Sequence, residues 1–372
     1  YFLMKNVLHI RSSGEFLGAE NVVLQLSNFS NEFGYNPHIL VIQDIRDDYP
    51  LLAEYAKEQG ISCSVIKTSK KIDLACVSAL KEIIKTHKID IIHTHGYKED
   101  LYTFLAFSST PVLATNHLWK KTNFTLKLYA FIDSLVLTRF QKIIAVSKAI
   151  QVEMKEISYL RNRDIELISN GIDYEKFNGN DQSLRKELNL PEETTLLLTV
   201  SSLTPEKGHR YLLNALADDS INQKNWHLAI VGGGREKDSL EQQVKQLKLD
   251  NQITFIGYRK DIPALLSAAD LYLLPSLDEG LPMALLEAMA AGKAAIATDV
   301  GDVAKVIKDN SVGKLIKSGD TEALTQALED ALNNKGWRES AGNCAKELIQ
   351  KEFSSHSMTS NYCAQYNAIL KG

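Results

Sequence analysis

The chain has 372 residues, of which 44% are apolar and 24% charged, with a net charge of −4 and an isoelectric point near 6.2. One hydrophobic core stops growing well below this length, so the size predicts two globular domains. The acidic balance argues against nucleic acid as a partner, because such binders usually carry basic surfaces.

The four cysteines are not spaced as a C-x-x-C pair, which predicts free thiols in a reducing compartment. No apolar run approaches the roughly 18–20 residues of a membrane span. We also expect no signal peptide, because the first apolar stretch is too short for one and leads into a strand. We therefore expect a cytoplasmic protein. Met4-Lys5 is typical of a natural start, which would make Tyr1–Leu3 a remnant ahead of it.

Apolar runs alternate with helical patterns along the first half. A run over Asn6–Ile10 leads through a polar turn into a helical pattern from about Glu20 to Phe33. Further runs follow at Pro37–Gln43, Asp90–His93, Val112–Thr115 and Lys142–Val146. This alternation predicts parallel strands joined by crossover helices. The runs are continuous, as expected for strands that are covered on both faces.

The same pattern restarts after Asn178. A polar stretch, Gly179–Glu193, predicts a linker or a surface helix. Apolar runs follow at Thr195–Val200, His227–Val231, Gln252–Ile256, Leu271–Leu274 and Ala294–Ala297. Helical patterns between them cover Arg210–Leu216, Arg235–Leu247 and Pro282–Ala291.

The fold class is therefore α/β, with two Rossmann-like, doubly wound parallel sheets. We expect a first domain over residues 1–175, a second over 176–354, and a C-terminal helix at about 355–372 that packs back on the first. Ligands of such sheets bind outside the carboxyl ends of the strands, so the cleft between two facing domains is the expected site.

Glycines follow the first strand of each half. Gly14 and Gly18 precede a helix, and Gly232–Gly234 follow a buried strand. Glycine lets the backbone approach a ligand, and a helix N-terminus offers free N–H groups to a phosphate. Both segments are equally compatible with plain steric turns or contact with a neighbouring loop.

Two glutamates flank the start of a predicted helix. Pro282 suits its first position and Gly292 its end, which places Glu279 on the preceding loop and Glu287 inside the helix among apolar neighbours. Carboxylates can accept two hydrogen bonds from sugar or ribose hydroxyls, while N–H groups at Gly280 and Leu281 suit a diphosphate. The alternative is a charge favourably placed at a helix start and a surface position for Glu287.

Lys207 lies after the first strand of the second half, in the stretch Thr204-Pro-Glu-Lys207-Gly208. A lysine at this place can neutralise a phosphate as a point charge. An exposed lysine in a turn is the commoner case.

Together these motifs resemble the retaining glycosyltransferases of family 4, which have the two-domain GT-B fold. The glutamate pair is spaced as that family's E-x7-E signature. The resemblance covers nearly the whole chain and is stronger in the second half. It rests on Ser169–Asp173, Leu203–Gly208, Val231–Gly234, Phe255–Arg259, Ala269-Asp270 and Pro275–Glu287 with Gly292.

The resemblance implies a role for each matching residue. Glu287 would hold the donor ribose, Glu279 would contact sugar hydroxyls with Gly280 and Leu281 nearby, and Lys207 would bind the diphosphate. Gly257, Tyr258 and Arg259 would line the base pocket, and Gly18 would face the donor phosphates. Gly14 and His95 would lie toward the acceptor. His117 would stabilise the reacting sugar, which makes His117, Glu279 and Lys207 the candidate catalytic residues.

The sequence departs from the family pattern in three stretches. Ser202, still a candidate donor contact, stands where arginine is usual, so Arg210 or Arg235 would have to supply a second cation. Leu17-Gly18 replaces a double glycine. Asp302 and Lys305 stand where glycine and glutamate are common. These changes leave the donor phosphate contacts and the donor's identity open.

We expect no metal and no other cofactor. No D-x-D motif lies at a strand end, and a lysine with helix N-termini can stabilise a leaving diphosphate. His93-Thr-His95 places two imidazoles on one face of a strand, but no third ligand is evident. Family resemblance implies retention of configuration, and a front-face attack, in which the leaving phosphate accepts the acceptor's proton, fits the absence of an identifiable nucleophile.

The expected function is transfer of a hexosyl or N-acetylhexosaminyl group from a UDP- or GDP-sugar to a hydroxyl, in surface polysaccharide or glycolipid synthesis. A lipid-linked or other glycan acceptor is implied by resemblance only. Residues 117–140 mix basic and large apolar side chains; we expect a core-packed helix with a solvated basic edge, with peripheral contact at the inner membrane face as the alternative. Other open alternatives are a non-catalytic nucleotide-sugar-binding protein, a GT-B-like epimerase and a sugar phosphorylase.

Overall fold

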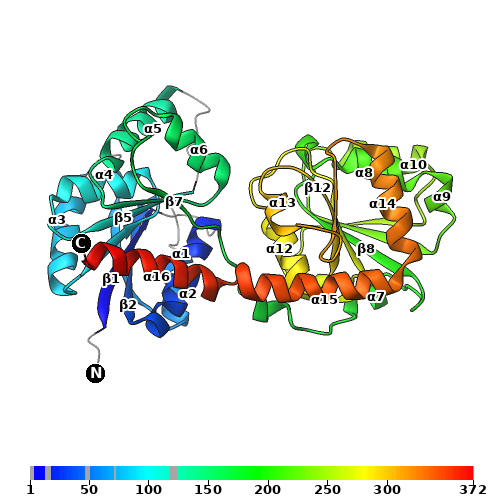
Figure 1. Cartoon of the computed structure of the whole chain (residues 1–372), viewed down its shortest axis with the longest axis horizontal. Coiled ribbons are helices and arrows are strands. Elements are labelled where there is room, and N and C mark those ends of the chain that lie inside the picture. The colour runs from blue at the N-terminus through cyan, green and yellow to red at the C-terminus, as the bar shows by residue number, and fades with distance from the viewer. Residues whose placement is uncertain (1–3, 13–17, 47–50, 71–72, 118–123, 372) are drawn as a thin grey trace. The chain divides into compact units, whose positions relative to one another are not determined.

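The computed structural model describes residues 4–12, 18–46, 51–70, 73–117 and 124–371. The chain forms two compact units (Figure 1), of which the first is Tyr1–Gly171 with Ser355–Gly372 and the second Ile172–Ser354. The first unit therefore ends after Gly171 rather than after residue 175. The segment Tyr1–Leu3 lies outside the described residues.

The first unit contains a seven-stranded parallel sheet in the order β3-β2-β1-β4-β5-β6-β7. Its strands are β1 (Lys5–Ser12), β2 (Tyr35–Asp44), β3 (Ser62–Thr68), β4 (Ile91–Thr94), β5 (Val112–Asn116), β6 (Lys142–Ala145) and β7 (Ile165–Leu167). Successive residues point to opposite faces of a strand. Accordingly Leu8 and Ile10 enter one core layer and Val7 enters the other.

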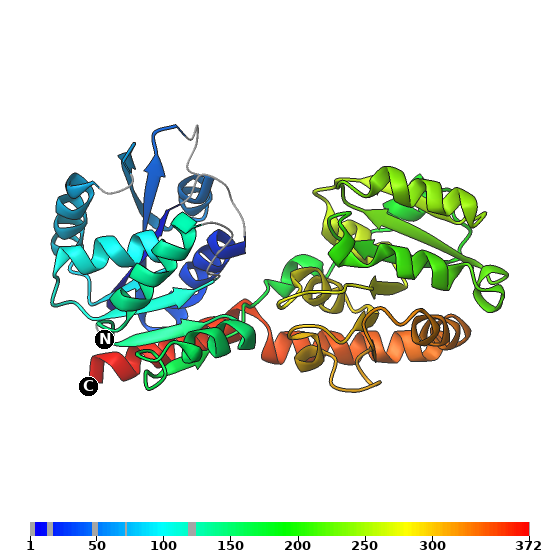
Figure 2. The same cartoon turned by 90° about the horizontal axis from the view of Figure 1, so that it is seen from above.

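Helices cover both faces of this sheet, as Figure 2 shows. One layer contains α3 (Leu74–Thr86), α4 (Tyr97–Ala106), α5 (Phe124–Leu137) and α6 (Lys148–Glu156). The other contains α1 (Gly18–Ser30), α2 (Leu51–Glu58) and the C-terminal α16 (Ser355–Lys371). The short η1 (Asn31–Phe33) continues α1. Helix α16 packs beside α1 (Figure 1) and buries Met358, Tyr362 and Tyr366 against the sheet.

The second unit contains a six-stranded parallel sheet in the order β10-β9-β8-β11-β12-β13. Its strands are β8 (Thr195–Val200), β9 (Trp226–Val231), β10 (Ile253–Gly257), β11 (Leu271–Leu274), β12 (Ala294–Thr298) and β13 (Lys314–Ile316). The fold is thus the predicted one: two Rossmann-like parallel sheets. Every predicted apolar run is a strand, and β3, β7 and β13 are additional.

Helices also cover both faces of the second sheet (Figure 2). One layer holds α7 (Ser183–Glu187), α11 (Ile262–Ala268), α12 (Met283–Ala290), α13 (Val303–Val306) and α15 (Lys335–Glu352). The other holds α8 (His209–Leu216), α9 (Asp219–Asn222), α10 (Lys237–Gln246) and α14 (Thr321–Asn333). The 3-10 turns are η2 (Tyr174–Phe177) and η3 (Pro205–Lys207). Pro282 caps α12 rather than occupying its first turn, and Gly292 follows the helix at a φ of +73°.

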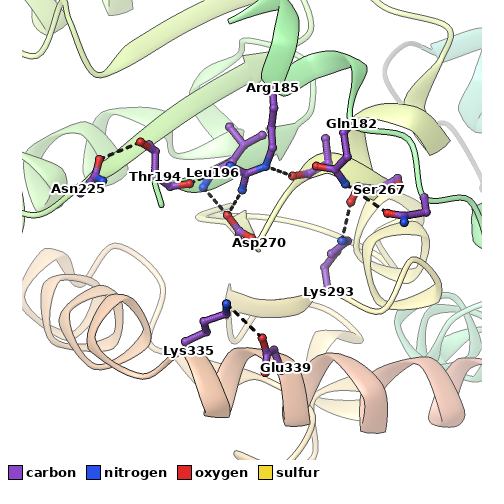
Figure 3. Close-up of polar contacts among 12 residues, drawn as sticks. Gln182, Arg185, Thr194, Leu196, Asn225, Ser267, Asp270, Lys293, Lys335 and Glu339 are labelled. Carbon is purple, nitrogen blue, oxygen red and sulfur yellow. Dashed lines mark hydrogen bonds and ion pairs between the residues drawn. The ribbon is translucent and has the colours of Figure 1, made fainter. Parts of the chain in front are cut away.

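Arg185 ties α7 to the sheet of the second unit (Figure 3). Its guanidinium pairs with the Asp270 carboxylate and donates to the carbonyls of Ala268 (3.1 Å) and Thr194 (3.0 Å). Asp270 also accepts from the Leu196 N–H at 2.7 Å. A charge-assisted network of this kind fixes the amino ends of β8 and β11 relative to α7. Asp270, one of the family-matching residues, therefore has a structural role.

In the part of the chain that the structure describes, no helix has the length and apolarity needed to cross a membrane.

The Arg185–Asp270 network yields a stability prediction. Asp270→Asn should lower the free energy of unfolding by about 2 kcal/mol, because the partly buried Arg185 loses its counter-charge. Urea unfolding followed by circular dichroism measures this. Glu339→Gln breaks the exposed Lys335–Glu339 pair, also seen in Figure 3, and is the matched control that should leave the midpoint unchanged. Equal midpoints for both variants would contradict the assigned role.

Candidate active site

The carboxyl ends of β8 and β11 are neighbours at the centre of the second sheet. Strands β9 and β10 extend the sheet on one side of β8, and β11, β12 and β13 on the other. A sheet leaves a crevice for a ligand at such a change of direction. Lys207 follows β8 and Glu279 follows β11, so both predicted residues belong to this switch point.

Glycines allow the loops at this edge of the sheet to pack in close contact. A Cβ on Gly208, whose φ is +67°, would lie 2.0 Å from the Pro275 carbonyl oxygen. A Cβ on Gly232 would lie 1.9 Å from the Ser201 carbonyl oxygen, and one on Gly234 2.4 Å from that of Leu203. The close approach at Gly232 and Gly234 is therefore to a neighbouring loop, which was one of the two expectations. These contacts place the post-β8 loop directly against the loops after β9 and β11.

Lys207 and Glu279 form an ion pair across these loops. The Lys207 Nζ lies 2.7 Å from Glu279 Oε1, which also accepts from the Ser276 hydroxyl at 2.7 Å. Only 21% of the lysine side chain and 10% of the glutamate side chain is exposed. An ammonium has three N–H donors, so one salt bridge leaves Lys207 able to donate to a further anion.

The loop after Glu279 is held by a second glycine contact. Gly301 has a φ of +55°, and a Cβ there would lie 2.1 Å from the Glu279 carbonyl oxygen. The Asp302 N–H donates to the Gly280 carbonyl at 2.8 Å. Asp302 also pairs with Lys305 at 2.9 Å, so the two departures from the family pattern are partners of each other.

Glu287 lies on α12 behind this loop. Among the described residues none hydrogen-bonds or ion-pairs with its carboxylate. Burial raises its pKa to about 7, because desolvation disfavours the charged form. Burial and the Glu287 charge raise the pKa of Tyr272. The Tyr272 hydroxyl donates to the Val200 carbonyl at 3.3 Å and not to Glu287. Glu287 is therefore neither a freely solvated surface residue nor one with a protein partner.

Of the two arginines that could supply a second cation, Arg210 is engaged elsewhere. Arg210 pairs with Glu236 at 3.2 Å and donates to the Ser239 hydroxyl. Ser202 is exposed, with its hydroxyl 3.4 Å from that of Thr204. Arg235 is exposed. The structure thus brings Lys207 together with Glu279 and does not bring Arg210 to them.

The segment Gly257–Arg259 follows the edge strand β10, two strands from β8. Gly257 has a φ of +78°, and the Tyr258 side chain is 79% exposed. Arg259 is bound by the Glu187 and Asp261 carboxylates at 3.0 and 2.6 Å, which raise its pKa. Tyr258 offers an open aromatic face, whereas Arg259 is already paired.

In the first unit, histidines line one face of the sheet at its own switch point, between β1 and β4. His9 on β1 is in register with His93 on β4, and His95 follows two residues later. The His9 Nδ1 lies 3.2 Å from the His95 Nε2, and the His95 Nδ1 lies 3.3 Å from the His117 Nε2. Three imidazoles therefore form a continuous hydrogen-bonded chain that ends at His117.

Burial keeps this chain uncharged. It lowers the pKa of His9 and of His117 to about 3, and it lowers the pKa of His95 well below the ordinary value. A neutral imidazole has one N–H and one acceptor nitrogen, so the tautomer of each ring determines that of the next.

His9, His93 and His95 place ligand nitrogens within 4.8 Å of one another, which supplies the third imidazole missing from the sequence pattern. However, the His93 nitrogens are bound to the Tyr366 hydroxyl (2.6 Å) and the Thr115 hydroxyl (2.8 Å). Both His95 nitrogens also have partners. The Nε2 of His9, by contrast, is buried without a hydrogen-bond partner among the described residues. A metal at this cluster would therefore have to displace the hydrogen bonds of His93 and His95.

Arg11 links the histidines to the first helix. It pairs with the buried Glu20 at 2.7 Å and donates to the His95 carbonyl at 2.6 Å. Gly18 begins α1 and is exposed, with no described atom within 4 Å of an added Cβ. Gly14, predicted to lie toward the acceptor, falls outside the described residues.

Sequence reasoning missed several of these residues. Arg11 and Glu20 flank the glycine turn but form a pair only in the fold. His9 was overlooked because its partners lie more than eighty positions away. The signal was present: an imidazole in an otherwise apolar strand is an uncommon choice for a covered position.

Two family descriptions match the chain. "Glycosyl transferases group 1" matches residues 180–348, and "Glycosyltransferase Family 4" matches residues 17–176. An N-acetyl-α-D-glucosaminyl L-malate synthase of Bacillus anthracis is 28% identical over 80% of each chain. A UDP-Gal:α-D-GlcNAc-diphosphoundecaprenol α-1,3-galactosyltransferase of Escherichia coli is 27% identical over 74% of this chain and 75% of its own.

Solved structures share the fold. A glycosyltransferase of Rickettsia africae superposes with a TM-score of 0.82 at 21% identity and full coverage of both chains. HepE of Anabaena, solved in complex with UDP and glucose, gives 0.77 at 21% identity, covering 98% of this chain and all of its own. With both halves matched, and with two parallel-sheet units of the same architecture as these solved structures, this chain belongs to glycosyltransferase family 4 and has the GT-B fold.

Proposed function

We propose that the chain transfers a sugar from a nucleotide-diphosphate donor to a hydroxyl acceptor, with retention of configuration. The observation that carries the proposal is Glu287, a partly buried carboxylate that has no partner among the described residues, on the helix that follows the Lys207–Glu279 pair. A buried acid left unpartnered is costly, so a ligand that supplies hydrogen bonds to it accounts for its retention.

The donor's parts correspond to these groups. The ribose hydroxyls donate to Glu287, and the diphosphate binds Lys207 and the N–H groups of Gly280 and Leu281. Glu279 accepts from the sugar hydroxyls with the oxygen that Lys207 and Ser276 do not use. The exposed Tyr258 is suited to stack on the base. Binding of UDP by HepE and use of UDP-Gal by the Escherichia coli enzyme support a UDP-sugar as donor.

Transfer then follows a front-face course. The acceptor hydroxyl attacks the anomeric carbon from the side on which the diphosphate leaves, and its proton passes to the leaving phosphate oxygen. Lys207 stabilises the charge that develops on that oxygen. His117 is uncharged at neutral pH and so acts by hydrogen bonding to the reacting sugar. His95 and His9 position it through the hydrogen-bonded chain.

Glu287 gives the first prediction. Ribose hydroxyls donate to the ionised carboxylate, so the affinity for UDP-glucose should depend on the ionisation of Glu287. The affinity should be constant above pH 7 and should fall by up to about tenfold per pH unit below about pH 7. Isothermal titration from pH 5.5 to 8.5 measures this; UDP-glucose suits it because its diphosphate does not titrate in that range. Glu287→Gln should bind more weakly at every pH, without the slope, whereas the exposed Glu241→Gln should behave as wild type.

The same residue affects stability. Its folded pKa of about 7 exceeds the ordinary 4.5, so the wild type loses stability as the pH rises between those values. Glu287→Gln should therefore be more stable than wild type by about 2 kcal/mol at pH 8 and by little at pH 4.5. If Glu287→Gln bound UDP-glucose as tightly as the wild type does, the assignment of Glu287 to the donor ribose would be wrong.

The histidine chain gives a kinetic prediction. His9→Phe fills the space without a nitrogen and should lower kcat about tenfold, with UDP-glucose affinity unchanged, because His117 loses its orientation. His9→Asn, whose amide can stand in for Nδ1, should recover much of the rate. The exposed His87→Phe is the control. If His9→Phe left the donor-hydrolysis rate intact, the chain would have no part in positioning.

We also expect turnover to be independent of divalent metal. Donor hydrolysis should continue in EDTA, because Lys207 and backbone N–H groups supply the electrostatic stabilisation. Loss of activity in EDTA with recovery in Mn²⁺ would contradict this. Tight UDP-glucose binding without any turnover would instead identify a nucleotide-sugar-binding protein.

A further inference from the structure

A cavity of about 350 Å³ opens at the carboxyl edge of the first sheet, within the first unit. Its lining residues follow β2, β3 and β4 and include one side of α5. Tyr97, which lines it, comes two residues after His95, and the Arg11 side chain that binds the His95 carbonyl also influences the pKa of Tyr97. The cavity therefore lies at the same edge of the sheet as the histidine chain, although none of the three histidines lines it.

Three cations line this cavity: Arg46, Lys70 and Lys98. Arg46 is bound by Asp44, with its Nη2 2.5 Å from Oδ2. Lys70 and Lys98 have no salt-bridge partner among the described residues. Lys98 lies close enough to Asp44, and Lys70 to Asp73, to lower the pKa of each carboxyl. The three cations nevertheless outnumber the two carboxylates that line the cavity, Asp44 and Asp133, and this excess favours an anionic ligand.

The cavity wall is aromatic and apolar. Tyr97 and Tyr129 stack with centroids 5.5 Å apart and planes 21° apart, and Leu101 and Ile132 complete the wall. At its floor, Asp133 hydrogen-bonds the buried Asp100, whose pKa burial and the Asp133 charge raise well above its ordinary value.

An apolar stripe continues from this wall along the outside of α5. Leu128, Phe131, Ile132 and Leu135 are 45%, 55%, 37% and 44% exposed. Their spacing of three, four and seven residues places them on one face of the helix. Within residues 127–137 the exposed side chains are these four and Lys127. Lys120 and Lys121, which belong to the expected basic edge, lie outside the described residues. Ile132 belongs to both the cavity and the stripe.

We propose that the cavity and the stripe bind a phosphate-linked lipid, with the phosphate at Lys70 and Lys98 and the hydrocarbon along Leu128, Phe131 and Leu135. This inference rests on the proposed function in one respect: the lipid is the acceptor, presented next to His95 and His117. A contiguous apolar surface beside a cavity in which cations outnumber carboxylates matches an amphiphile with an anionic head better than it matches a neutral glycan or a free anion.

Binding of three probes to the full chain tests this without turnover. Decyl phosphate, kept below its micelle concentration, should bind at least about tenfold more tightly than inorganic phosphate and than neutral decyl glucoside, measured by isothermal titration with the donor site saturated by UDP. Lys70→Ala/Lys98→Ala should remove the advantage over decyl glucoside. Leu128→Ser/Phe131→Ser should remove the advantage over inorganic phosphate.

Two substitutions on the same unit serve as matched controls. Lys81→Ala and Leu74→Ser replace an exposed lysine and a leucine that is 72% exposed on α3, and both should bind decyl phosphate as wild type does. Equal affinity for all three probes, or equal losses in the controls, would overturn the proposal. So would inorganic phosphate binding as tightly as decyl phosphate, which would indicate a soluble anionic acceptor. Affinity for UDP-glucose should be unchanged in all four variants, so a failure here is separate from a failure of the donor assignment.

Discussion

The backbone contact between Gly208 and the Pro275 carbonyl determines where the charges of the second unit lie. Only a residue without a side chain permits this approach, and its positive φ turns the chain back into α8. The contact holds the loops after β8 and β11 together, and so the ammonium of Lys207 reaches the carboxylate of Glu279. A larger residue at position 208 would separate the two groups before it touched any ligand.

Two kinds of buried charge result from this arrangement. The charge of Glu279 is balanced by Lys207, and its carboxylate accepts a hydrogen bond from Ser276, so its position is fixed in the free protein. Glu287 has no hydrogen-bond or ion-pair partner among the described residues, so only protonation or a bound ligand would stabilise its carboxyl group. One loop and the helix after it thus contain both a preorganised carboxylate, Glu279, and a destabilising one, Glu287. Such a division is common at functional sites, which depart from the rules that optimise stability.

The sequence predicted the central strands well because those strands are covered on both faces and contain continuous apolar runs. It missed β3, β7 and β13, which lie at the sheet edges; β3 alternates in exposure, and the other two have only three residues. Lys207, Glu279 and Glu287 were identified by motif, but the 2.7 Å ion pair depends on glycine contacts between distant loops. The His9–His95–His117 chain depends on strand register, which no local pattern specifies.

Helix α16 makes the first unit depend on residues that are synthesised after the whole of the second unit. The hydroxyls of Tyr362 and Tyr366 reach Thr115 and His93, so residues at the end of the chain complete a core whose strands begin at Lys5. Domains usually fold in order as they leave the ribosome. Here the second unit can close its own core first, while the first lacks part of the cover on one face of its sheet until residues 355–371 have been synthesised. This interval is when the nascent chain is most exposed to aggregation.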